Sequence, residues 1–532
     1  MCLEKVEKVK AKNGFFRKMT EFFDNTSNFR MVFLLAMFLD IRYLYYDLYF
    51  AVVVAMFVWS AFLIIKHYII RKRILRIRFR QIIFVFLLSG LFTVILHSEK
   101  NLFQNLVTLY WLVVSFFLFF GIHGEKSNIR VKKEMKRIFD VIVFITTIIM
   151  IVGLVLFAIY PNGLKLFGYS FCIYEGRFVG VIPNANVTAF YAVIAIVFSS
   201  FLLRMKKADK TRTTGIRIYY ICCIAINSFT ILLTDSNSTL LFVIVFLTFL
   251  FFYELFKEFS EKKIHTFLFR TSASLLSCVL VVSSLLFLRV SVQNGVSSML
   301  LMRQSEMIVS TTLDANDDNI QLDKAEGDLK LSEKEEEQKR MGHQNTNIDS
   351  GRFVLWRQAL GLIEKFPVFG IGKENISDYG VEYLGGLRYS DLGGYKYIDF
   401  HNGLLTITVS FGLVGLSLFM VLAISVAKAI LKSIFKFKER SRRDGNVLVL
   451  IAAFSAAYCV YSMFEVALLL DYTYRVCIFW LIIGLGMSYV QKYSQQYKHT
   501  GSKLPPLYDD SSEINYLSNK FGIVKREAKH AK

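Results

Sequence analysis

Long apolar runs separated by short polar loops dominate the chain. Each run is about 17 to 23 residues long, the length that an α-helix needs to cross a hydrocarbon layer of about 30 Å. The pattern predicts an all-α polytopic membrane protein with about 12 transmembrane helices. The expected spans are 30–46, 48–66, 81–97, 102–122, 138–160, 181–203, 217–234, 238–256, 271–289, 403–431, 447–465 and 475–490.

The connecting loops alternate in charge, and this alternation predicts how the chain crosses the membrane. Lys and Arg crowd the loops 66–80 and 123–137, whereas 98–101 and 161–177 carry few. Because cytoplasmic loops carry the excess of basic residues, we expect both termini in the cytoplasm of a multi-pass cell-membrane protein, with an uncleaved first span as signal anchor. The net charge of +21 then reflects membrane orientation, so no nucleic-acid partner is expected.

Five regions follow from this topology. They are a cytoplasmic N-terminal segment 1–29, spans 1 to 9 in 30–289, a large extracytoplasmic loop 290–402, spans 10 to 12 in 403–490, and a cytoplasmic tail 491–532. The large loop divides at about residue 350. The part 290–349 is an acidic insertion with few aromatic residues, which predicts a flexible or helical segment. The part 350–402, where the character of the sequence changes, is expected to be the catalytic segment.

A His-Asn pair stands where the large loop meets span 10. His401 and Asn402 lie at the mouth of the expected helix, and Gly412 and Gly415 lie deeper within it. Imidazole titrates near neutrality, so His401 can take a proton from a sugar hydroxyl. The glycines remove side chains from one face, so we expect another helix or a lipid tail to approach there. An interfacial histidine beside a packing face is the alternative.

An amphipathic helix is predicted earlier in the loop, in the stretch DSGRFVLWRQALGLIEKFPVFGIG at 349–372. It should lie along the outer leaflet, with Trp356 toward lipid and with Arg352 and Arg357 at the level of the phosphates. Two interfacial arginines on a surface helix would give the same pattern.

Both elements resemble a known family. His401-Asn402, nine residues, and then Gly412-Leu-Val-Gly415 resembles the H-N-x9-G-x-x-G signature of bacterial, Wzy-like O-antigen ligases and related polysaccharide polymerases. The G-R-x3-W and P-x2-G-x-G pieces of 351–372 resemble a second element of that family. The resemblance covers about residues 170 to 490. It implies metal-independent glycosyl transfer from a polyprenyl-pyrophosphate donor, with no cofactor.

A third likeness lies at the start of span 6, where relatives carry an Arg followed by an N-x-N or N-P-N element. Here Arg177 precedes Asn184 and Asn186. Asn amides in an apolar helix should face a cavity, although ordinary helix capping is the alternative. Relatives carry Ser-Arg where this chain has Ser236-Asn237. If that arginine holds a phosphate in the relatives, Arg177 is the candidate for the contact here, and a polar turn that joins two hydrophobic helices is the alternative.

The candidate catalytic residues are therefore His401 as general base, with Arg352 and Arg177 binding the pyrophosphate. The candidate substrate-binding residues are Asn402, Asn184, Asn186, Trp356, Arg357 and Glu465. No metal site is expected.

The sequence is compatible with several functions. The missing Ser-Arg and the acidic insertion favour a polymerase of O-antigen, capsule or exopolysaccharide repeats. The alternatives are a ligase that attaches finished glycan to another acceptor, a flippase for lipid-linked oligosaccharide, and a non-enzymatic scaffold. The expected partners are the lipid-linked glycan donor, a glycan acceptor, membrane lipid, and flippase and chain-length regulator proteins.

Overall fold

The structure is a computed structural model that describes most of the hydrophobic part of the chain. The described residues are 17–39, 46–161, 163–166, 169–174, 177–182, 184–208, 211, 213–259, 287, 288, 290, 291, 295, 298, 352–387, 399–436, 442–471 and 473–500. The predicted span 271–289 and the acidic insertion 290–349 lie outside this set apart from the isolated residues named.

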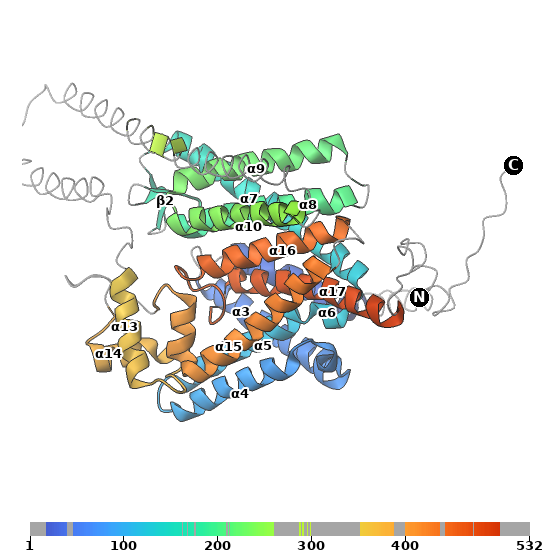
Figure 1. The fold of residues 1–532 in the computed structure, drawn as a ribbon. Helices are drawn as coiled ribbons and strands as arrows, with labels where there is room; N and C mark the ends of the chain where they lie inside the picture. Colours follow the sequence, from blue (N-terminus) through green and yellow to red (C-terminus); the bar gives the residue numbers. More distant parts are fainter. Residues whose placement is uncertain are drawn as a thin grey trace, which may run out of the picture.

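Long helices packed side by side form the molecule (Figure 1). They are α2 (Thr26–Leu39), α3 (Tyr46–Leu63), α4 (Arg80–Leu96), α5 (Leu102–Val114), α7 (Asn128–Ile159), α8 (Ala185–Ala208), α9 (Thr214–Thr234), α10 (Asn237–Phe259), α15 (Gly403–Lys436), α16 (Arg442–Tyr461) and α17 (Tyr474–Thr500). The π-helical segments η2 (Ile64–Ile70) and η4 (Ser115–Phe120) extend α3 and α5. Within the described residues, eight helices are long and apolar enough to span a membrane. Three shorter apolar helices match further predicted spans. The predicted class is confirmed.

The loops gather at two ends of this bundle because successive helices alternate in direction. One end, here called the His401 end, carries residues 97–101, 177–182, 235–236, 352–402 and 462–471 so far as they are described. It includes α13 (Arg352–Lys365) and α14 (Ile376–Leu384), which Figure 1 shows together at one side. The opposite end, here called the basic end, carries η3 (Arg73–Arg76) and α6 (Ile122–Glu125).

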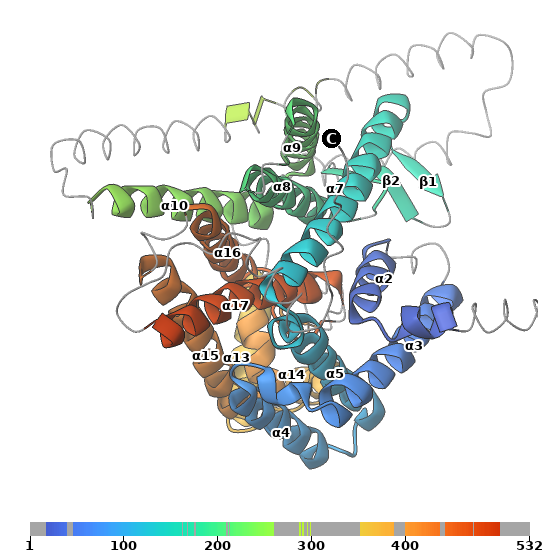
Figure 2. The ribbon, with the colours of Figure 1, turned by 90° about the vertical axis from the view of Figure 1, so that its right-hand side faces the viewer.

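The helix α8 lies in the middle of one half of the bundle. It packs against α7, α9 and α16, and Figure 2 shows it between α7 and α10. Its alanines Ala189, Ala192 and Ala195 are fully buried. Small side chains let neighbouring backbones approach closely, which is the main source of helix association where lipid surrounds the protein.

A small antiparallel sheet stands before α8 and was not predicted. Its strands β1 (Leu164–Leu166), β2 (Tyr169–Tyr174) and β3 (Arg177–Gly180) pair in chain order. Arg177 opens β3 opposite Tyr174, so the β2–β3 hairpin sets its position. The segment 161–177, which the sequence analysis treated as a simple loop, is therefore partly folded.

The helix α15 is broken at Gly412, whose φ of 66° and ψ of −172° lie outside the helical region. After the break, two N–H groups of α15 donate to carbonyls of the loop 367–372 instead of to carbonyls of the helix. Leu413 donates its N–H to the carbonyl of Pro367 (2.8 Å), and Val414 donates to that of Val368 (3.1 Å). A continuous helix would instead satisfy these groups four residues back.

The carbonyls left without partners before the break are satisfied by the same loop, 367–372. Ile371 donates its N–H to the carbonyl of Val409, and Gly372 donates to that of Ser410, both at 2.9 Å. The loop thus replaces two helical hydrogen bonds with four bonds of its own. Gly412 was expected to admit a helix or a lipid tail, but the structure places a loop there.

A side chain at Gly412 should prevent this insertion. Its φ is one that only glycine adopts readily, and an added Cβ would collide with the carbonyl of Val368. We expect Gly412→Ala to lower the free energy of unfolding by at least about 2 kcal/mol. Thermal unfolding of the purified protein in detergent measures this loss. The control is Gly361→Ala on α13, where a Cβ meets only Leu384 at an ordinary 3.4 Å. Equal stability of the two variants would contradict the prediction.

Candidate active site

Glu465 is the centre of a charged cluster at the His401 end. It lies in the loop between α16 and α17, and its side chain is only 9% exposed. Its Oε1 lies 3.5 Å from Arg352 Nη2. Its Oε2 lies 3.8 Å from His401 Nδ1 and 3.7 Å from Arg475 Nη1. One buried carboxylate thus joins residues from the starts of α13, α15 and α17.

Arg177 is linked to the same cluster through Asn186. The amide Nδ2 of Asn186 donates to Glu465 Oε1 (3.3 Å), and Arg177 Nη2 donates to Asn186 Oδ1 (2.9 Å). The guanidinium of Arg177 also donates to the carbonyls of Thr234 (3.0 Å) and Asp235 (3.2 Å). The structure therefore brings Arg177, Asn186, Glu465, Arg352 and His401 into one network.

This arrangement also places Arg177 at the turn before Asn237. The family resemblance implies an arginine at the position of Asn237, and here the guanidinium of Arg177 occupies the adjacent turn through its two carbonyl contacts. A positive charge is therefore present near that turn although the local sequence lacks one.

The backbone around His401 is held in an unusual conformation. His401 has φ +46°, in the left-handed region that residues with a Cβ adopt infrequently. Its N–H donates to Asp399 Oδ1 (2.8 Å), which fixes the turn. The next residue but one, Gly403, donates its N–H to the carbonyl of Ser462 (2.7 Å) and so ties the start of α15 to the Glu465 loop.

Asn402 caps the helix that begins after this turn. Its Oδ1 accepts hydrogen bonds from the N–H groups of Leu404 and Leu405, both at 3.0 Å. This is an N-cap of α15, which satisfies donors that a helix start leaves free. Asn402 therefore fixes where α15 begins relative to His401.

The electrostatics of the cluster raise the proton affinity of the imidazole and keep the neighbouring carboxylate ionised. Burial by itself would lower the pKa of His401, but the negative charges of Glu465 and Asp399, each with an oxygen 3.8 Å from Nδ1, outweigh it, so the pKa is raised. Burial would raise the pKa of Glu465, but His401, Arg475 and Arg352 lower it on balance. His401 is therefore a stronger base than a free imidazole.

Arg475 was missed in the sequence analysis. Besides Glu465 it contacts Asp471, with Nη2 to Oδ2 at 3.0 Å. An arginine that opens an otherwise apolar span, four residues after an aspartate, is a recognisable sign of a paired charge. Its side chain is 14% exposed and lies between the carboxylates of Glu465 and Asp471, and it holds both of them in place.

Two buried donors next to the cluster have no hydrogen-bond partner among the described residues. They are Arg352 Nε and Trp356 Nε1. The indole of Trp356 also packs 6.0 Å from the ring of Phe464, beside Glu465 in the chain. Because buried donors are normally satisfied, these atoms are available to acceptor atoms of a bound ligand.

The remaining predicted residues lie outside the network. Arg357 is exposed on α13, and Asn184 is exposed with its Oδ1 accepting from the N–H of Val187. His97, another histidine at this end, contacts the hydroxyl of Tyr379 (2.7 Å) rather than the cluster. Within the described part of the chain, no group of three His, Cys, Asp or Glu is arranged to hold a metal ion.

Fold and site together define a polytopic helical membrane protein with a buried His–Glu–Arg cluster at one end of the bundle. Residues 222–420 match the family described as O-antigen ligase, which confirms the resemblance found in the sequence and supports a role in glycan transfer. The matched region includes Arg352 and His401 but stops before Glu465. No curated protein matches the chain.

Removal of the Glu465 charge should lower the pKa of His401. In Glu465→Gln, the burial and the charge of Arg352 that oppose protonation remain, while the principal stabilising partner is lost. We expect His401 to titrate above its ordinary 6.5 in the native protein and at a clearly lower pH in the variant. The pH dependence of carbethoxylation of His401, followed by peptide mass spectrometry, reports this because only neutral imidazole reacts. Glu382→Gln, at the same end but paired to Lys100, is the control and should leave the titration unchanged.

Proposed function

We propose that the protein transfers glycan from a polyprenyl-pyrophosphate-linked oligosaccharide to an acceptor hydroxyl, polymerising the repeat units of a surface polysaccharide. The observation that carries this proposal is the convergence of His401 and Arg352 on Glu465, with Arg177 joined through Asn186. These are a base and two guanidinium groups, gathered from distant parts of the sequence. A reaction that deprotonates a hydroxyl and releases a pyrophosphate needs these groups.

The proposed location is the outer surface of the cell membrane. Arg71, Arg73, Arg76 and Lys126 lie at the basic end, and basic loops remain in the cytoplasm. The His401 end then faces outward. A lipid-linked donor would present its pyrophosphate at that boundary, where the cluster lies just beyond the starts of α15 and α17.

The bond changes follow from the roles of the groups. The acceptor oxygen forms a bond to the anomeric carbon of the donor glycan, and the bond from that carbon to the pyrophosphate oxygen breaks. The hydroxyl proton passes to His401, and the polyprenyl pyrophosphate leaves with the bonding electron pair. Arg352 and Arg177 stabilise the charge that develops on the leaving phosphates. Glu465 and Asp399 stabilise the imidazolium once it forms.

The conformation of His401 supports this assignment. A left-handed backbone at a residue with a Cβ costs of order 1–3 kcal/mol, and such strain concentrates at functional positions. The Asp399 contact and the Asn402 cap hold the strained turn in place, so the imidazole is already oriented before substrate binds.

A ligase is the second candidate, because the matched family is described as O-antigen ligase. It would use the same donor and the same base, with a different acceptor. The two reactions differ in the product that accumulates when the protein is absent. Glycans limited to one repeat unit would indicate a polymerase, and full-length chains left unattached would indicate a ligase.

Loss of His401 should abolish product without loss of protein. We expect His401→Ala to lower the rate of glycan transfer by about 100-fold or more, because general-base catalysis contributes on the order of 10² to 10⁴. Arg352→Ala should cause a comparable loss. The measurement is polymer formed in a deletion strain that carries each variant, with membrane abundance quantified in the same cells.

The charge-matched control is Lys365→Ala, which removes a positive charge from the other end of α13. It should retain activity. A flippase or a scaffold would tolerate His401→Ala, so full product at normal abundance in that variant would rule out the proposed reaction.

A further inference from the structure

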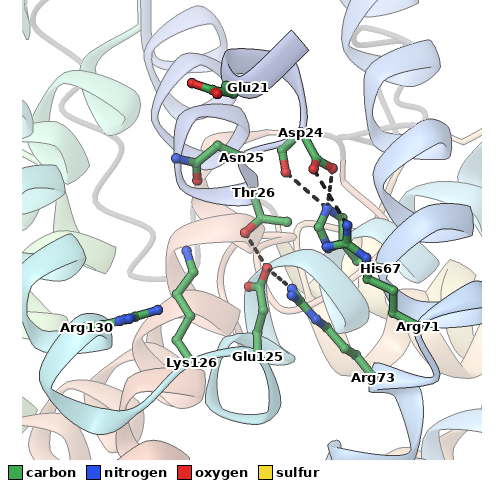
Figure 3. A pocket seen from close by; sticks show the side chains of 10 residues that line it. All are labelled: Glu21, Asp24, Asn25, Thr26, His67, Arg71, Arg73, Glu125, Lys126 and Arg130. Carbon is green, nitrogen blue, oxygen red and sulfur yellow. Dashed lines mark hydrogen bonds and ion pairs between the residues drawn. The ribbon is translucent and has the colours of Figure 1, made fainter. Parts of the chain in front are cut away.

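A second polar site lies at the basic end, far from the Glu465 cluster. It is a pocket of about 310 Å³ between the start of α2, the η2–η3 segment and the α6–α7 junction. Its lining residues are Glu21, Asp24, Asn25, Thr26, His67, Arg71, Arg73, Glu125, Lys126 and Arg130. Figure 3 shows Lys126 and Arg130 on one side of Glu125, with Arg71 and Arg73 on the other.

The carboxylates of this pocket are already paired with basic residues, both behind the lining and within it. Glu125 is bound by Arg30, whose side chain is fully buried, and it also accepts a hydrogen bond from Thr26. Asp24 contacts Lys66 at 2.9 Å. Glu125 also lies 3.3 Å from the lining residue Arg73, and Glu134 pairs with Lys126 at 2.7 Å. The carboxylates therefore offset part of the charge of Arg73 and Lys126, but less of the charge of Arg71 and Arg130.

Two of the lining arginines remain open toward the pocket mouth. Arg71 is 47% exposed, its Nη1 lies 3.3 Å from His67 Nδ1, and its Nη2 reaches Asp24 only at 3.9 Å. Arg130 is exposed and forms no ion pair with another described residue. The pocket and its ion-pair partners contain seven basic residues and four carboxylates, a surplus of three positive charges with His67 neutral. The members are Arg17, Arg30, Lys66, Arg71, Arg73, Lys126 and Arg130 against Glu21, Asp24, Glu125 and Glu134. The pocket thus favours an anion.

Exposed apolar side chains border the pocket in the sequence. Ile69 and Ile70, directly before Arg71, are 60% and 69% exposed. Phe22 and Phe23, between the lining residues Glu21 and Asp24, are also exposed. A basic site next to apolar side chains at the end of a membrane span fits a lipid, whose phosphate lies just above its acyl chains.

We propose that this pocket binds the phosphate of an anionic phospholipid headgroup from the leaflet at the basic end. Arg71 and Arg130 contact the phosphate at the mouth, and Arg73 and Lys126 supply positive charge behind it. Ile69, Ile70, Phe22 and Phe23 contact the acyl chains. The same phosphate chemistry is offered by free inorganic phosphate, which lacks the apolar part.

Lipid binding to the purified full-length protein tests this proposal. Native mass spectrometry in detergent would follow titrations with dioctanoyl phosphatidylglycerol, dioctanoyl phosphatidylcholine and inorganic phosphate. We expect the anionic lipid to bind more tightly than the zwitterionic one. The double variant Arg71→Ala/Arg130→Ala should lose roughly fivefold in affinity for each arginine removed, because each basic residue near a lipid surface contributes a factor of about that size.

The matched control is Arg76→Ala/Arg137→Ala, which removes two exposed arginines from the same two segments but outside the lining. It should bind phosphatidylglycerol as the native protein does. Equal loss in both double variants would show that only net charge matters and would overturn the proposal. Binding of inorganic phosphate that depends on Arg71 and Arg130, without preference for the anionic lipid, would also overturn it. Neither pair contacts Glu465, so glycan transfer would not decide the outcome.

Discussion

The insertion of the loop 367–372 into the break of α15 fixes the geometry on which the His401 end depends. An unpaired backbone group within a membrane helix costs several kcal/mol, so a break persists only where other groups satisfy it. Here the loop donates to the carbonyls before the break and accepts from the N–H groups after it. Because this loop directly follows α13, the same four hydrogen bonds hold the helix that begins with Arg352 against the helix that follows His401.

The buried carboxylate of Glu465 is the second requirement of the site. Three positive or proton-accepting groups surround it, and each would be costly to bury alone. Burial raises the pKa of Glu465, yet its partners outweigh that effect, so the carboxylate stays ionised and can stabilise a protonated His401. The charges on Glu465 and His401 therefore depend on each other. This coupling explains how a histidine, rather than a more basic residue, can accept a proton in a partly dry site.

The sequence analysis succeeded where a pattern had a single physical cause. The length of each apolar run is set by membrane thickness, so most described helices overlap a predicted span, although α7 begins at Asn128 rather than at 138 and α17 ends at Thr500 rather than at 490. The His-Asn and Gly-Arg elements located His401 and Arg352. It failed where distant segments decide the structure. Gly412 reads as a packing glycine unless the loop that enters the break is known. Arg475 reads as a boundary charge until Glu465 and Asp471 are placed beside it. Asn402 stays a predicted sugar ligand, and its Oδ1 also caps α15.

The two ends of the bundle use charged residues in opposite ways. At the His401 end the cations are held by carboxylates and backbone carbonyls, and the free capacity is limited to oriented donors such as Arg352 Nε and Trp356 Nε1. At the basic end the carboxylates are paired with Arg30, Lys66, Arg73 and Lys126, and the guanidinium groups of Arg71 and Arg130 remain exposed. The oriented donors at the His401 end favour a ligand that is bound in a single pose, as a substrate must be. The exposed guanidinium groups at the basic end favour a phosphate that is held by charge, so an orienting site and an anchoring site can coexist in one chain without competing for the same ligand.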